Sequence, residues 1–230
     1  MQTNKILLFI VEGPSDEQSL APALEKIILQ KNVKFKVIHG DITSDSNSNI
    51  NNIEKRISNN CVKKFINENS QYNLSDIYGI VHIVDLDGAF IPDDNIEEDP
   101  SIIKPKYMPD KILCKNKAKF LATHNNKQSI LRHLSTIDKI LNIPYSIFYM
   151  SCNLDHVLHN KPNSTDFEKK INSIIFGDNY DDPLKFEDFF NCKKIKIEGT
   201  YEESWKYITI NLNSLKRGSN FWICINSFKV

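Results

Sequence analysis

Residues 5–16 read KILLFIVEGPSD, and residues 77–88 read IYGIVHIVDLDG. In both stretches a nearly continuous apolar run ends at an acidic residue, and a glycine follows closely. Strands that are covered on both faces of a parallel sheet have this apolar pattern. The two stretches therefore predict buried strands over residues 5–11 and 77–84, each followed by an acidic turn.

The segment between these strands is expected to hold two helices and one more strand. Ser15 stands three residues before Gln18, which is the spacing of a capping box at the start of a helix. Residues 35–39 read as a strand, and residues 53–66 carry apolar side chains in helical phase after a Ser- and Asn-rich loop at 41–52. This alternation of strand and helix predicts right-handed crossovers and a parallel sheet.

Residues 89–120 interrupt the alternation and are interpreted as an insertion or flap. They contain four prolines, an acidic cluster and then a lysine cluster. Helical spacing over residues 126–141 and an apolar run over 145–150 predict a further helix and a fourth strand. Residues 221–225 are apolar again and are interpreted as a short last strand or as a tail docked on the core.

Together these patterns predict an α/β fold with a mostly parallel, four-stranded, Rossmann-like sheet flanked by helices. Residues 1–151 would form the α/β domain, interrupted by the inserted flap at 89–120. Residues 152–230 have a weaker helical pattern. They would form a mainly helical C-terminal extension packed on the same core.

Composition restricts the classes of protein. The chain has 230 residues, with 29 Lys plus Arg against 29 Asp plus Glu, and so no net charge. This balance argues against a protein that grips nucleic acid by bulk charge and against a polybasic membrane binder. The apolar run at residues 6–11 is too short to span a bilayer, and no signal-peptide pattern precedes it. We therefore expect a soluble, cytoplasmic protein with no membrane partner.

Three acidic residues follow the two most apolar strands: Glu12, Asp85 and Asp87. In open α/β sheets, function concentrates just past the carboxyl ends of the parallel strands. If these two strands are neighbours, the three carboxylates come together and repel one another. A divalent cation removes the repulsion, and ligation by oxygen alone suits Mg²⁺ or Mn²⁺. Such a site can hold and polarise a phosphodiester and activate water, although each motif alone is also a common turn.

The stretches at residues 9–16 and 83–88, FIVEGPSD and IVDLDG, resemble the Toprim domain. Toprim domains are shared by type IA and type II topoisomerases, bacterial primases, recombination mediators and OLD-family nucleases. The Glu-Gly-x-x-Asp form is most similar to OLD-type and stand-alone antiphage (abortive-infection) Toprim nucleases. The sequence has no Gly-x-x-x-x-Gly-Lys-[Ser/Thr] motif, so the ATPase half of an OLD protein is not represented in it.

The resemblance implies a Toprim-like sheet and a metal-dependent nuclease of RNA, such as tRNA, or of DNA. Glu12 would be the general base or acid and also a metal ligand. Asp85 and Asp87 would be catalytic residues that bind Mg²⁺ or Mn²⁺, and Asp16 would be a further ligand or a group that supports the ligands. An antiphage effector role, with an ATPase or another activating protein as partner, follows from the resemblance alone.

The densest basic stretch lies within and just after the inserted segment. If it borders the metal site, its lysines would track phosphates and bind nucleic acid. The alternative is a solvated surface that balances the acidic cluster before it. The lysines are Lys104, Lys106, Lys115, Lys117 and Lys119.

Other interpretations stay open. Cys152, His156 and His159 have helical metal-ligand spacing, but partly buried histidines in a helix give the same pattern. The domain could instead be a non-catalytic binding or regulatory module of a larger complex, with the acidic insertion engaging a basic partner. A primase-like or phosphotransfer enzyme is a third reading.

Overall fold

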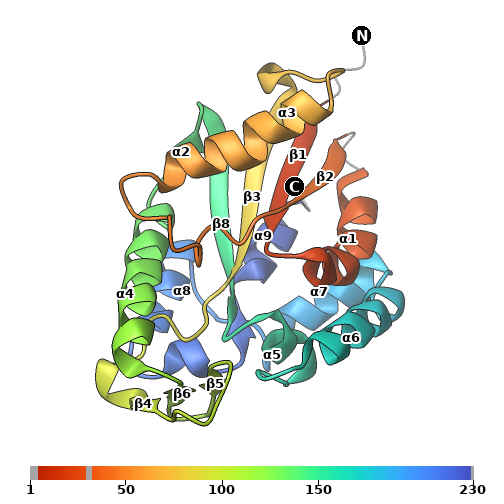
Figure 1. Cartoon of the computed structure of the whole chain (residues 1–230). Coiled ribbons are helices and arrows are strands. Elements are labelled where there is room, and N and C mark those ends of the chain that lie inside the picture. Colours follow the sequence, from red (N-terminus) through yellow and green to blue (C-terminus); the bar gives the residue numbers. More distant parts are fainter. Residues whose placement is uncertain (1–4, 30–32, 229–230) are drawn as a thin grey trace.

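A mostly parallel sheet forms the centre of the computed structural model, which describes residues 5–29 and 33–228 (Figure 1). Four strands run parallel in the order β2-β1-β3-β8, which confirms the predicted α/β class. Two-residue strands β7 and β9 pair antiparallel with β8, so the sheet has six strands and not four. The strands are β1 (Ile6–Val11), β2 (Lys34–His39), β3 (Ile77–Asp85), β7 (Lys139–Ile140), β8 (Ile143–Ser151) and β9 (Gly218–Ser219).

The side chains of the central strands alternate between two apolar cores. In β1, Leu8 and Ile10 belong to one core, whereas Phe9 and Val11 belong to the other. Burial on both faces explains why this strand is apolar at every position. The first core is covered by α2 (Ile53–Ile57), a π-helix (Ser58–Lys63), α3 (Lys64–Glu68), α4 (Lys117–Leu134) and α8 (Tyr201–Ile208). The second is covered by α1 (Pro14–Leu29), α5 (Leu154–His159), α6 (Asp166–Asn179), α7 (Pro183–Asn191) and α9 (Phe221–Ser227).

The segment after residue 151 therefore contributes helices to both faces of the sheet. Short 3-10 helices lie at Leu74–Asp76, Asp93–Asn95 and Asn213–Leu215. Among the residues that the structure describes, no helix combines the length and the apolar character needed to cross a membrane.

The inserted segment folds into a small sheet of its own. Its strands have the order β4-β6-β5, with β4 (Ile96–Glu98) parallel and β5 (Lys106–Tyr107) antiparallel to β6 (Ile112–Cys114). In Figure 1 this sheet lies at the lower end of the molecule, where β3 and β8 also end. The insertion is therefore placed beside the carboxyl edge of the main sheet.

Helix α4 begins earlier and ends earlier than the helix expected over residues 126–141, so that expectation was wrong at both ends. Asn116 caps its start, because the Asn116 side chain accepts a hydrogen bond from the Lys119 N–H. At the other end, the Ser135 and Thr136 hydroxyls donate to carbonyl oxygens of the last turn. Hydroxyl side chains that bind the backbone in this way compete with helix continuation.

The apolar segment at residues 221–225 is part of helix α9, neither a strand nor an irregular tail. The short strand of this region is β9, which comes just before it and pairs with the end of β8. The Asn220 side chain then accepts a hydrogen bond from the Tyr149 N–H of β8, at 2.9 Å. The Asn220 side chain therefore takes the place of a backbone partner for β8, and the backbone after Asn220 forms helix α9.

Helices α1 and α6 approach one another closely at Gly177. A Cβ atom at this position would stand 2.4 Å from the backbone oxygen of Gln18 and 3.6 Å from Pro22. We expect Gly177→Ala to destabilise the protein by roughly 1–3 kcal/mol, the usual cost of overpacking, although alanine favours a helix over glycine. Thermal denaturation measures the effect, with Gly13→Ala as the control because nothing lies within 4 Å of its added Cβ. An unchanged Tm for Gly177→Ala would contradict this packing.

Candidate functional site

Glu12 and Asp85 stand at the carboxyl ends of neighbouring strands. β1 pairs with β3 in parallel, so that Ile10 lies beside His82. Just beyond this pair, Glu12 Oε1 accepts a hydrogen bond from the Asp85 N–H at 3.0 Å. Asp85 Oδ1 accepts another from the Leu154 N–H at 2.8 Å, where the chain has left β8 and enters α5. The strand order thus brings the two acidic motifs of the sequence together.

Asp87 lies just past Asp85, has left-handed backbone geometry (φ 50°) and is held by two donors. The Lys127 Nζ is 2.6 Å from Asp87 Oδ2, and the Tyr107 hydroxyl donates to Asp87 Oδ1 at 2.9 Å. Lys127 is only 5% exposed, and its ammonium also donates to Ser44 Oγ. A buried cation of the chain itself therefore neutralises the Asp87 carboxylate.

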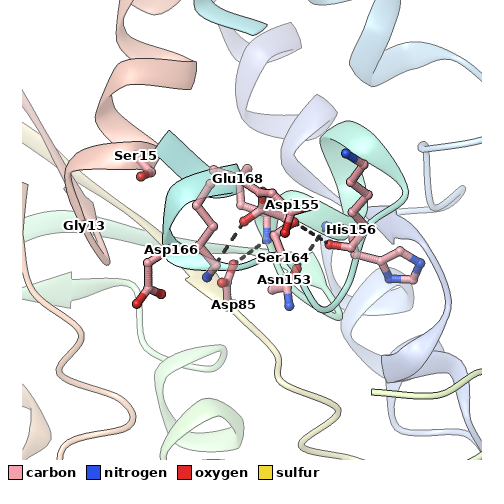
Figure 2. Close-up of polar contacts among 12 residues, drawn as sticks. Gly13, Ser15, Asp85, Asn153, Asp155, His156, Ser164, Asp166 and Glu168 are labelled. Carbon is pink, nitrogen blue, oxygen red and sulfur yellow. Dashed lines mark hydrogen bonds and ion pairs between the residues drawn. The ribbon is translucent and has the colours of Figure 1, made fainter. Parts of the chain in front are cut away.

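Asp16 lies in the first turn of α1 and binds its own turn. Its Oδ2 accepts a hydrogen bond from the Gly13 N–H at 3.0 Å. Across a narrow gap from Asp16, the Lys169 Nζ of α6 is 3.8 Å from Asp155 Oδ2 of α5. Figure 2 shows Asp85 in the region between the turn at Gly13 and the helix that carries Asp155. Asp16 is a neighbour of the pair formed by Glu12 and Asp85, because its carboxylate acts electrostatically on both.

Burial and mutual repulsion set the charge of these carboxyl groups. Burial, with a smaller effect of neighbouring carboxylates, raises the pKa of Glu12 to about 8, that of Asp16 to about 6 and that of Asp85 well above its ordinary value. Burial acts on Asp87 too, but the Lys127 ammonium and the hydrogen bonds to Asp87 outweigh it and lower its pKa. The Lys127 charge therefore compensates Asp87 most strongly, whereas burial outweighs the effect of Lys127 on Glu12 and that of Lys169 on Asp16.

Lys127 and Tyr107 are site residues that the acidic motifs did not reveal. Lys127 is one helical turn from Leu131 and shares the buried face of α4 with it and with Ile130. A lysine on an apolar stripe is unusual, because lysine is almost never fully buried without a partner. This break in the stripe is the sequence signal that would have indicated a buried carboxylate.

A pocket of about 790 Å³ opens above Glu12, Asp85 and Asp87. One wall is the segment 101–107 of the insertion, and the opposite wall is the segment 162–166 that leads into α6. Lys104 and Lys106 lie on the first wall, so the fold brings these two predicted lysines to the carboxylates. The residues that line the pocket do not include the other three predicted lysines, Lys115, Lys117 and Lys119.

The carboxylates of this site are suitable ligands for a hard divalent cation. Their present positions, however, are determined by hydrogen bonds with backbone amides. Glu12, Asp16 and Asp85 offer carboxylate oxygens, the ligands that Mg²⁺ and Mn²⁺ prefer. Within the described part of the chain, no three His, Cys, Asp or Glu side chains are arranged to hold one metal ion. Metal binding would therefore require the carboxylates to draw closer together, while one oxygen each of Glu12 and Asp16 now accepts a hydrogen bond from the amides of Asp85 and Gly13.

The helical spacing of Cys152, His156 and His159, which also resembled a set of metal ligands, has a structural explanation. His156 Nδ1 accepts a hydrogen bond from the Cys152 N–H at 3.4 Å, and the His159 ring packs edge-on against Phe176. The Arg217 guanidinium donates to carbonyl oxygens in the last turn of α5. These contacts hold α5, and with it the Leu154 amide that binds Asp85, in place.

The chain matches no protein-family model, no curated protein sequence and no solved structure. The Toprim resemblance therefore stays a prediction carried by the motifs at residues 9–16 and 83–88. What the fold adds is their position, because both motifs end neighbouring parallel strands.

The ion pair between Lys127 and Asp87 should stabilise the fold. Removing one partner of a buried pair costs about 3–5 kcal/mol, and we expect roughly 2–4 kcal/mol for Lys127→Met because the Asp87 side chain is 32% exposed. Urea denaturation measures this cost. Lys119→Met, at an exposed position of the same helix, is the matched control and should change stability little. Equal losses in the two variants would show that the ion pair does not stabilise the protein.

The raised pKa values give the metal-free protein a defined pH dependence. The Glu12 carboxyl has an ordinary pKa of 4.5 and a pKa of about 8 in the folded protein. As pH rises, the unfolded chain releases this proton first, so the free energy of unfolding falls from about pH 4.5 to about pH 8. We expect Tm in EDTA to fall from pH 5 to pH 8 and Glu12→Gln to weaken that fall. The exposed Glu25→Gln should leave the profile unchanged, and a wild-type profile for Glu12→Gln would refute the assignment.

Proposed function

We propose that the protein is a Mg²⁺- or Mn²⁺-dependent phosphodiester hydrolase of the Toprim type, a nuclease that acts on RNA or DNA. The observation that carries the proposal is the gathering of Glu12, Asp85 and Asp87 at the carboxyl ends of β1 and β3, below an open pocket with lysines on one wall. Carboxylates in such a position are typical of metal-dependent phosphoryl chemistry. The cytoplasm as its location and an antiphage role are part of the proposal and rest on the resemblance.

The residues that would hold the metal are Glu12, Asp16, Asp85 and Asp87. When bound, the metal would polarise the phosphodiester and lower the pKa of a water molecule. Glu12 would accept the proton of the attacking water and return it to the leaving oxygen, a task that a positioned carboxyl group can perform. Lys127 would fix the position of Asp87 through their ion pair.

A second candidate function is a non-catalytic binding or regulatory module. It is favoured by Asp87, since both of its carboxylate oxygens already have donors in Lys127 and Tyr107. A site of this kind can be a stable internal salt bridge and not a metal centre. The acidic insertion would then engage a basic partner protein.

Cleavage of labelled tRNA, single-stranded RNA, plasmid DNA and single-stranded DNA tests the nuclease. Each substrate is incubated with Mn²⁺, with Mg²⁺ and with EDTA. We expect metal-dependent products, and a loss of at least 100-fold for Asp85→Asn, because this change removes one charged oxygen ligand. Asp94→Asn, an exposed position of the insertion, is the matched control and should cleave like wild type. Full activity of Asp85→Asn would refute the assignment of the site.

Metal-dependent stabilisation separates the two candidate functions. A metal that binds only the folded state must raise Tm by mass action. The nuclease is expected to gain several degrees in millimolar Mn²⁺, and Asp87→Asn should reduce that gain. A binding module without a metal site would have the same Tm with Mn²⁺ as with EDTA.

A further inference from the structure

The pocket above the carboxylates is bridged by contacts between its two walls. We call the wall formed by residues 101–107 the flap and the wall formed by residues 162–166 the loop. The Asn163 side chain accepts a hydrogen bond from the backbone N–H of Tyr107 and donates one to the backbone carbonyl oxygen of Tyr107, each at 2.8 Å. The Lys104 Nζ contacts both oxygens of Asp166, at 3.0 and 3.1 Å. The flap and the loop are therefore joined beside the pocket that holds the carboxylates.

The two bridges differ in how easily they open. Lys104 and Asp166 have side chains that are 74% and 83% exposed, and ion pairs as exposed as this one contribute little to stability. Tyr107 is tied at three points, by Asn163 twice and by Asp87 once. The flap is thus anchored at its Tyr107 end and weakly closed at its Lys104 end. Figure 2 shows Asp166 and Ser164 of the loop in the same region as Asp85.

The size of the pocket fits one strand better than a duplex. Its volume of about 790 Å³ is in the range of small-molecule sites, so it can admit part of one strand and not a whole duplex. The lysines that line it are Lys104, Lys106 and Lys169, of which Lys104 and Lys169 already contact carboxylates.

The flap also presents an apolar surface for a base. Ile103 is 90% exposed, follows the buried Ile102 and stands next to Lys104 on the pocket wall. Pro105 comes next, before Lys106. A single strand exposes both its bases and its phosphates, so a base can bury apolar surface against Ile103 while the phosphates contact the lysines.

We infer that the substrate enters this site as a single strand of nucleic acid, threaded between flap and loop. Lys104 exchanges Asp166 for a phosphate, Lys106 contacts a neighbouring phosphate, and a base rests on Ile103. This inference rests on the proposed nuclease function and adds the substrate class to it.

Binding of fluorescein-labelled oligonucleotides, followed by anisotropy in Ca²⁺, tests the inference on the wild-type chain. The probes are a 12-nucleotide RNA, a DNA of the same sequence and the corresponding blunt duplexes. We expect at least tenfold tighter binding of the single strands. With two lysines in contact, the slope of log K against log salt concentration should be about −1.4. Comparison of the affinities for the RNA and the DNA single strands then shows which of the two is preferred.

Substitutions inside and outside the pocket test whether the single strand binds there. Lys106→Glu and Ile103→Ser should each weaken single-strand binding about fivefold or more. Lys119→Glu makes the same charge change outside the pocket and should have less than a twofold effect. Circular dichroism and Tm confirm that all three variants are folded, which is expected because the three positions are exposed.

The outcomes separate this inference from the proposed function. Equal or tighter binding of the duplexes, or equal effects of Lys106→Glu and Lys119→Glu, would overturn the single-strand inference. Cleavage of duplex in Mn²⁺ under those conditions would leave the nuclease assignment intact. Absence of metal-dependent cleavage together with absence of binding by any probe would overturn both.

Discussion

The hydrogen bond from the Asp85 amide to the Glu12 carboxyl joins the two acidic motifs across 73 positions of sequence. It exists because β1 and β3 are parallel neighbours and end together at one edge of the sheet. The same edge receives Leu154, whose amide binds Asp85, and Tyr107, whose hydroxyl binds Asp87. The main sheet, the insertion and the C-terminal helices therefore all meet at this cluster of carboxyl groups.

Charge compensation in this cluster is uneven, and the proposed function depends on this unevenness. Lys127 neutralises Asp87 and lowers its pKa, whereas the pKa values of Glu12 and Asp85 are raised. A protein that needed only stability would compensate all of these charges or replace them with apolar side chains. Carboxyl groups that are buried without a full set of countercharges are instead common where a cation or a proton is handled.

The sequence predicted the features that depend on local pattern. The apolar runs before Glu12 and Asp85 fixed two strands, and their acidic ends indicated the site. The partner of Asp87 could not be predicted in this way, because Lys127 meets it only through the packing of α4 on the sheet. Likewise, the choice of Lys104 over Lys119 as a pocket residue depends on how the insertion folds into its own small sheet. The Toprim resemblance, the nuclease activity and the metal stay predictions.

The central claim is that these carboxyl groups form a metal site, and Mn²⁺ soaked into crystals of the wild-type protein tests it most directly. Anomalous scattering locates the ion without reference to activity or to a substrate. We expect one peak within coordination distance of the Glu12 and Asp85 carboxylates. A fully soaked crystal with no peak there, and with the Glu12 hydrogen bond and the Lys127 ion pair intact, would contradict the account.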